Sequence, residues 1–215
     1  MRRYVLPSLL ALLSATALSA QPLVRVPGDA DFQQAIQRVS DGGAIELAPG
    51  VYPSPADGFR MRNLGKSFTV RSAPGGRAVL DGGGSSFILR MENTEPARGG
   101  LVTFEDLTFR DGFSALDGRA GGVTVQAGEA RFVGCDFEGN VADPASTGGG
   151  ALAVHTGSTV EVLGGTFSGN SSKNRGGAMA VRGDSFATVA GVTFTGNRTN
   201  LPGHVPNSAG GALYV

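Results

Sequence analysis

A phrase ending in Phe-x-x-Asn recurs through the second half of the chain and constrains the fold more than any other feature. Its full copies end at Phe137-Glu-Gly-Asn140, Phe167-Ser-Gly-Asn170 and Phe194-Thr-Gly-Asn197, and a degenerate copy ends at Phe109-Arg-Asp-Gly112. The four phenylalanines are 28, 30 and 27 residues apart. Repeats of this length are typical of stacked supersecondary units, which bury their apolar faces against one another.

The pattern inside the phrase indicates strands. Small or apolar residues stand two, five and seven positions before each Phe, as Cys135, Phe132 and Ala130 do before Phe137. This is strand alternation interrupted by a bend, and it differs from the spacing of a helix. A second phrase, Gly-Gly-Ala, stands at 149–151, 176–178 and 210–212, with a variant at 121–123, and introduces a third strand. The repeat therefore predicts an all-β fold, a parallel β-helix with three strands per coil.

Equivalent residues of stacked coils lie about 4.8 Å apart. We therefore expect the four phenylalanines to form an interior column, and Asn140, Asn170 and Asn197 to form a ladder bonded amide to amide. Cys135 occupies an inward position, which favours a buried small hydrophobe over a reactive thiol. The glycine pairs would let neighbouring backbones approach closely.

In the strand after each glycine pair, the position of a charged residue indicates which side chains point into the core. If Ala178 and Ala180 pointed inward, Arg182 would follow them into the core, which is costly without a partner. We therefore expect the opposite residues inside, namely Met179, Val181, Leu152 and Val154. His155 then faces solvent. The strand that begins at Val123 fits this frame only with a shift of one residue.

The Phe-x-x-Asn and Gly-Gly-Ala phrases resemble the repeats of the polymorphic outer-membrane proteins, a family of bacterial surface proteins. More widely, the chain resembles the pectin-lyase-like superfamily. The motifs carry the resemblance over residues 100–215, and residues 24–100 share it less specifically. It implies a right-handed parallel β-helix at a bacterial surface.

The first 20 residues have the outline of a signal peptide. Arg2 and Arg3 precede an apolar run from Tyr4 to Leu13, and small residues follow it. The run is too short to span a bilayer. We therefore predict cleavage near Ala20, export, and one β-helix domain over residues 21–215. No later segment is apolar enough to cross a membrane as a helix.

The two ends of the predicted coil differ. Residues 31–39 form a short amphipathic helix, with Asp31 as N-cap and Gln34 completing a capping box. This helix is expected to cover the exposed strand edges of the first coil. The chain stops at Val215, inside a strand of a new coil. That end predicts either a truncated product or an open face capable of end-to-end self-association.

Charge and residue usage argue against several classes of function. The chain has 18 Lys and Arg against 18 Asp and Glu, with no concentrated basic segment, so nucleic-acid binding is not expected. His155 and His204 have no second histidine or nearby Asp at metal-ligand spacing. We expect neither a metal nor a cofactor. Arg131 and Glu161 should form a surface ion pair between adjacent coils.

Enzymes of the superfamily, as the resemblance implies, act on acidic polysaccharides with Asp, Lys and Arg on an outer strand face. Asp136 and Glu138 flank Phe137 and so point outward together, about 7 Å apart. That separation overlaps the range for an inverting glycosidase. Arg110, one coil earlier, could bind an anionic sugar. Later coils carry only hydroxyl residues at these positions, so an ordinary solvated strand face explains the pair equally well.

The connections between the two phrases vary in length and fall at one corner. They span 113–120, 141–148, 171–175 and 198–209. Insertions on one face of a repeat protein often line its binding surface. We therefore predict a secreted or cell-surface scaffold that acts as an adhesin-like binding module without catalysis, its partner being a polysaccharide or a host or neighbouring cell surface. The alternative is a polysaccharide lyase or glycoside hydrolase acting on acidic polysaccharide.

Overall fold

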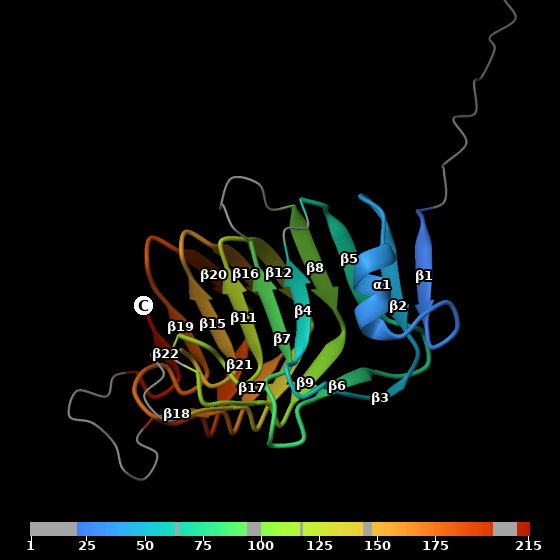
Figure 1. Cartoon of the computed structure of the whole chain (residues 1–215). Helices are drawn as coiled ribbons and strands as arrows, with labels where there is room; N and C mark the ends of the chain where they lie inside the picture. The colour runs from blue at the N-terminus through green and yellow to red at the C-terminus, as the bar shows by residue number, and fades with distance from the viewer. Residues whose placement is uncertain (1–20, 63–64, 94–99, 117, 144–147, 200–209) are drawn as a thin grey trace, which may run out of the picture.

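The chain coils into a three-walled parallel β-solenoid in the computed structural model (Figure 1). The structure describes residues 21–62, 65–93, 100–116, 118–143, 148–199 and 210–215. The predicted signal peptide, residues 1–20, lies outside these ranges. Every strand pairing in the described residues is parallel, so the predicted parallel β-helix with three strands per coil is confirmed.

Sheet 1 has seven strands in the order β1-β2-β5-β8-β12-β16-β20. Their bounds are β1 Leu23–Val26, β2 Ala44–Leu47, β5 Phe68–Ser72, β8 Leu101–Glu105, β12 Glu129–Val133, β16 Thr159–Leu163 and β20 Phe186–Ala190. Sheet 2 follows the order β21-β17-β13-β9-β6-β3. Its strands are β3 Gly50–Pro53, β6 Ala78–Asp81, β9 Leu107–Arg110, β13 Asp136–Glu138, β17 Thr166–Ser168 and β21 Thr193–Thr195.

Sheet 3 follows the order β22-β19-β15-β11-β7-β4. Its strands are β4 Phe59–Arg62, β7 Leu89–Glu92, β11 Val123–Gln126, β15 Leu152–His155, β19 Met179–Val181 and β22 Leu213–Tyr214. A small corner sheet, β10-β14-β18, joins sheets 2 and 3 in the middle coils. Its strands are β10 Phe113–Ser114, β14 Val141–Ala142 and β18 Ser171–Ser172.

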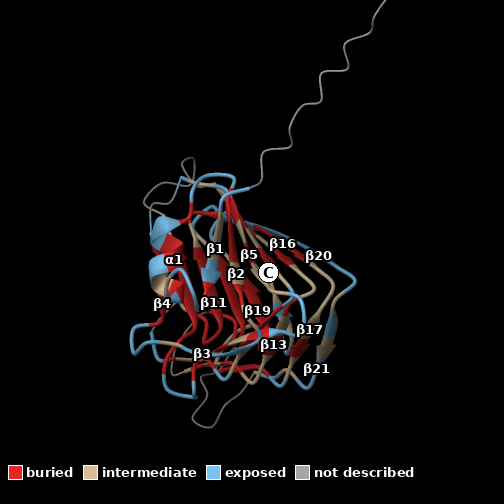
Figure 2. Cartoon of the chain, turned by 90° about the vertical axis from the view of Figure 1, so that its right-hand side faces the viewer, coloured by how far each residue is buried: buried red, intermediate tan, exposed pale blue. Residues whose placement is uncertain are grey.

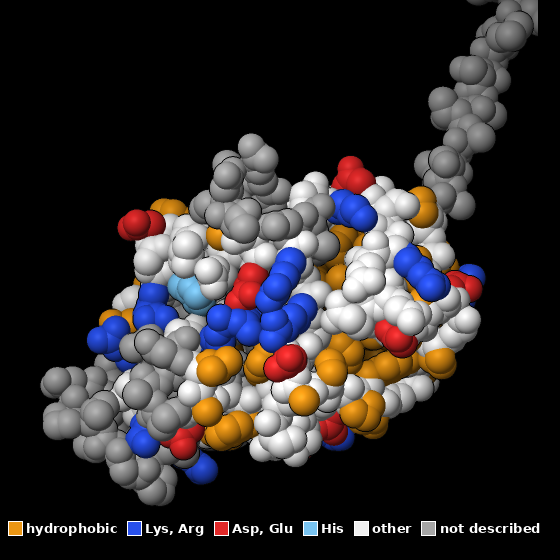
Figure 3. All heavy atoms as spheres, in the orientation of Figure 1, with side chains coloured by type: hydrophobic (Ala, Val, Ile, Leu, Met, Phe, Trp, Pro, Cys, Tyr) orange, Lys and Arg blue, Asp and Glu red, His pale blue; other side chains and the backbone are white. Residues whose placement is uncertain are grey.

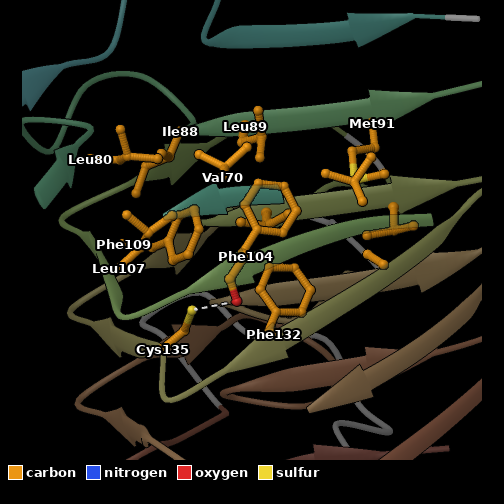
Figure 4. Packing of buried hydrophobic residues seen from close by; sticks show 14 of the residues in the cluster. Val70, Leu80, Ile88, Leu89, Met91, Phe104, Leu107, Phe109, Phe132 and Cys135 are labelled. Carbon is orange, nitrogen blue, oxygen red and sulfur yellow. Dashed lines mark hydrogen bonds between the residues drawn. The ribbon is translucent and has the colours of Figure 1, made fainter. Parts of the chain in front are cut away.

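The predicted phenylalanine column fills the interior beside sheet 2. Ring centroids of Phe109 and Phe137 are 4.9 Å apart, those of Phe137 and Phe167 4.4 Å, and those of Phe167 and Phe194 5.1 Å. Phe104 and Phe132 form a second stack on sheet 1, at 5.0 Å, and meet the first column edge to face (Figure 4). Offset and edge-to-face aromatic pairs each add roughly 0.5–1.5 kcal/mol beyond the area they bury.

The asparagine ladder closes the corner after sheet 2. Asn170 Oδ1 accepts both the backbone N–H of Asn140, at 2.9 Å, and its Nδ2–H, at 3.0 Å. Asn170 Nδ2 in turn donates to the Phe137 carbonyl at 2.9 Å. Asn197 repeats these contacts one coil later. Asn140 and Asn170 are fully buried, so their amides replace hydrogen bonds that water cannot supply.

Glycine is required where the coils come closest. A Cβ on Gly165, whose φ is +81°, would lie 1.9 Å from the Cys135 carbonyl oxygen. The second glycine of the Gly-Gly phrase is similarly confined, since a Cβ on Gly150 would lie 2.3 Å from the Gly177 carbonyl oxygen and 2.5 Å from that of Ser171. The predicted close approach of backbones at these pairs is therefore confirmed.

The inward residues of sheet 3 are those expected. Leu152, Val154, Met179 and Val181 are buried and belong to the core. Val123 pairs with Leu152, so the one-residue shift that this strand needs is present. The outward residues Ala153 and Ala180 are also buried, and Gly149 and Gly176 lie close to the Ala180 backbone. Figure 2 shows buried residues, in red, on the strands that enclose the core.

Helix α1, Phe32–Arg38, covers the first edge of sheet 3, as predicted. The Asp31 carboxylate accepts the Gln34 N–H at 2.8 Å, and Phe32 packs on Phe59 of β4 with ring centroids 4.8 Å apart. Gln33 pairs with the edge itself: its Nε2 donates to the Arg60 carbonyl at 3.0 Å, and its Oε1 accepts the Arg60 N–H at 2.9 Å. A side-chain amide thus takes the place of a peptide in a neighbouring strand.

Phe167→Ala is expected to lower the free energy of unfolding by about 3–5 kcal/mol, because it opens a cavity in the middle of the column. Phe186→Ala is the matched control: that side chain is 71% exposed, and its removal should change stability by less than about 0.5 kcal/mol. Urea titration monitored by circular dichroism measures both. A loss below about 1 kcal/mol for Phe167→Ala would contradict the stacked core.

Asn170→Ala should destabilise the protein more than Asn197→Ala. The first change strands the Asn140 amide groups and the Phe137 carbonyl in a fully buried corner, at about 1–3 kcal/mol for each unsatisfied group. The ladder bonds of Asn197 are only partly buried, so water can replace some of them. Equal losses in the same titration would show that the ladder does not depend on burial.

Candidate functional site

The candidate carboxylate Asp136 is held by neighbours on both sides. On the outer face of sheet 2, its Oδ2 lies 3.1 Å from Nη1 of Arg77, and its Oδ1 accepts the Thr166 hydroxyl at 2.8 Å and the Thr166 N–H at 3.0 Å. Arg77 also donates to the carbonyls of Leu107, at 3.3 Å, and Gly134, at 2.8 Å. Asp136 and Arg77 thus fasten consecutive coils of sheet 2 together.

The candidate cation Arg110 is committed to other carboxylates. It forms an ion pair with Asp81, its register neighbour on β6, and its Nε lies 3.5 Å from Asp111. The hydrogen bond that Arg110 donates to Asp81 raises the pKa of Arg110. Burial raises the pKa of Asp81, but the hydrogen bonds from Arg110 and from the Gly83 N–H outweigh burial, and the pKa is lowered overall.

The three candidates lie on the same outer face of sheet 2. Glu138 pairs in register with Arg110 on one side and Ser168 on the other, so the expected column exists. Asp136 and Arg110, however, are both engaged by neighbouring residues of the coil, Asp136 by Arg77 and Thr166 and Arg110 by Asp81. The hydroxyl residues of β17 and β21 extend both rows, so no carboxylate row builds up.

The sequence predicts the burial of Cys135 correctly but overestimates the exposure of His155. Cys135 is buried, as predicted. His155 points out of sheet 3 but is only partly exposed, contrary to expectation, because the chain around Gly118 covers it. Burial and then the nearby Arg182 lower the pKa of His155. Among the described side chains, no three of His, Cys, Asp or Glu are grouped as a metal site would require.

An arginine cluster that the repeat pattern does not predict lies on the outer face of sheet 3. Around Glu92 lie three guanidiniums: Arg90 Nη2 is 2.7 Å from Oε1, Arg119 Nη1 is 2.5 Å from the same oxygen, and Arg62 Nε is 4.0 Å from Oε2. Arg60 stands beside them and pairs with Asp57 at 3.7 Å. Figure 3 shows these blue side chains crowded around a red one in the middle of that face.

The signal for this cluster was the alternation of charge in two segments. Phe59-Arg-Met-Arg62 and Leu89-Arg-Met-Glu92 both alternate apolar and charged residues, and they pair in register as β4 and β7. Their outward residues therefore meet, Arg60 beside Arg90 and Arg62 beside Glu92. The two segments carry neither Phe-x-x-Asn nor Gly-Gly-Ala, so the repeat alignment did not place them in one row.

No protein-family model matches the chain, and no curated protein matches it. Among solved structures, the chain is similar to a crystal structure of pectate lyase Pel9A, at 15% sequence identity and a TM-score of 0.29. The similarity covers 89% of this chain and 81% of that one. A search of the described residues for a helix able to cross a membrane finds none.

Cys135 is expected to resist thiol reagents in the folded protein. Burial raises the pKa of its thiol from 9.0 to about 12, and the thiolate is the reactive form. Ellman's reagent should label almost nothing at mildly alkaline pH and one thiol per chain in denaturant. Stoichiometric labelling of native protein would contradict the buried assignment.

The same pKa shift gives a direction to the pH dependence of stability. Between pH 9 and about 12 the unfolded chain loses the thiol proton while the folded chain keeps it. The contribution of Cys135 to folding therefore falls as pH rises above 9. A Cys135→Ala variant should lose less stability over that range than the parent protein.

Proposed function

We propose that the protein is a secreted or cell-surface β-helix scaffold, an adhesin-like binding module that carries out no catalysis. The observation that carries this proposal is the engagement of Asp136 by Arg77 and Thr166, together with the ion pair between Arg110 and Asp81. These are the groups that a lyase or hydrolase on this face would need in reactive form. Here they join one coil to the next.

The proposed location rests on the sequence. The first 20 residues follow the pattern of a secretory signal, and the repeats resemble those of bacterial outer-membrane surface proteins. One cysteine, with no disulfide framework, is compatible with a scaffold whose stability comes from stacking. The proposed partner is a polysaccharide, or the surface of a host or neighbouring cell.

The scaffold suits recognition because its surfaces are fixed before any ligand arrives. Outward side chains are spaced by the strands, and many are held by ion pairs, such as that between Arg131 and Glu161. A surface that is already ordered loses little conformational entropy on binding. Two described residues of these connections lie against sheet 3, Gly118 beside Arg182 and Gly149 beside the Ala180 backbone.

The alternative function is a lyase or hydrolase of acidic polysaccharide. The observation that favours it is geometric: Asp136 and Glu138 project from one short strand, and Arg110 adjoins Glu138 in register. For catalysis to occur, Asp136 would have to leave Arg77 and Thr166 when substrate binds.

Incubation with polygalacturonate, alginate and chondroitin tests the two functions directly. We expect no release of unsaturated products or reducing ends above the blank, with or without divalent cations, and the same result for Asp136→Asn. Retention of the protein on one of these immobilised polymers, without turnover, is the supporting result. Turnover that Asp136→Asn abolishes would establish the enzyme instead.

A further inference from the structure

The arginine cluster places like charges side by side, and the carboxylates within it, Asp57 and Glu92, are fewer than its guanidiniums. Arg60 and Arg90 stand directly opposite each other on β4 and β7. Like charges at such positions are destabilising. Glu92 binds Arg90 with both Nε, at 2.8 Å, and Nη2, and it lies only at the margin of ion-pair distance from Arg62.

One arginine of the cluster is fixed and two are presented. The Arg90 side chain is 7% exposed and lies over the Phe87 ring, 5.1 Å from its centroid. The Arg62 side chain is 60% exposed, and that of Arg60 is 32% exposed. Arg90 is buried and Glu92 partly exposed, and beside them Arg60 and Arg62 offer more exposed guanidinium N–H groups.

A hollow adjoins the two presented arginines. It lies between α1 and β4, and the residues that line it are Gln33, Ile36, Gln37, Pro55, Asp57, Gly58, Arg60 and Arg62. The wall thus combines the apolar surface of Pro55 with the polar side chains of Gln37, Arg60 and Arg62. Such a lining suits a sugar ring, which offers C–H groups on its faces and polar groups on its edge.

We propose that this hollow binds a glycan through a sulfate or phosphate ester held by Arg60 and Arg62. The inference rests on the proposed function, since it names a ligand class for the binding module. Guanidinium groups form paired, charge-assisted hydrogen bonds with such oxyanions. Arg60 and Arg62 line the same hollow, so both guanidiniums can engage one oxyanion. The anion would relieve the repulsion between Arg60 and Arg90.

Isothermal titration with a sulfated heparin-derived hexasaccharide tests the site, with its desulfated counterpart and inorganic sulfate as comparison ligands. Arg62→Gln should weaken binding of the sulfated hexasaccharide by about tenfold or more, because it removes a hydrogen bond to a charged group. Arg60→Gln should act in the same direction. Asp57→Asn should strengthen binding, since the Asp57 side chain is 86% exposed and competes for Arg60.

Arg131→Gln is the matched control. It removes the same charge from the outer face of sheet 1, where the Arg131 side chain is 43% exposed, and should leave the affinity within about twofold. Equal losses for Arg62→Gln and Arg131→Gln would reduce the effect to net charge and overturn the site. Equal affinity for the desulfated hexasaccharide would show that the site does not recognise the ester group. Equal affinity for inorganic sulfate would show that it does not recognise the sugar. Polysaccharide turnover would refute the proposed function while leaving this anion site intact.

Discussion

Register between successive coils is the constraint on which the rest of the structure depends. Parallel pairing places each residue beside its equivalent in the next coil, about 4.8 Å away. An aromatic ring, an amide or a glycine is therefore useful only if its neighbours in the column are compatible. The phenylalanine column and the asparagine ladder satisfy this condition with identical residues. The column that contains Cys135 and Gly165 satisfies it with complementary sizes.

The same register decides what the outer faces can do. Where successive coils carry opposite charges, they fasten the coil, as Arg71 does with Glu46 and Arg131 with Glu161. Where they carry like charges, as Arg60 and Arg90 do, the two side chains repel each other, and an anion bound at that face would lower the repulsion. Asp136 is held differently, by Arg77, which precedes β6 and reaches past β9 to it. The arginine cluster is of the second kind, which makes it the candidate binding surface.

Much of the fold could be predicted because its repeats are spelled out residue by residue. Phe-x-x-Asn and Gly-Gly-Ala determine the column, the ladder and the corner, and the capping box determines where α1 begins. The predicted helix over residues 31–39 is one residue too long at its end: α1 stops at Arg38, since Val39 already has an extended backbone. The partners of Asp136 and the burial of His155 could not be predicted, because Arg77 and the chain around Gly118 reach them from outside the repeat pattern. The arginine cluster was missed for the same reason.

Gln33 has a consequence for how such a coil could grow. Its amide binds the backbone N–H and C=O of Arg60, which would otherwise be available to a further strand. Phe32 packs on Phe59 beneath them. Addition of a further strand is therefore hindered at Arg60 on this edge of sheet 3, whereas β1 and β3 form the edges of sheets 1 and 2 at the same end of the coil.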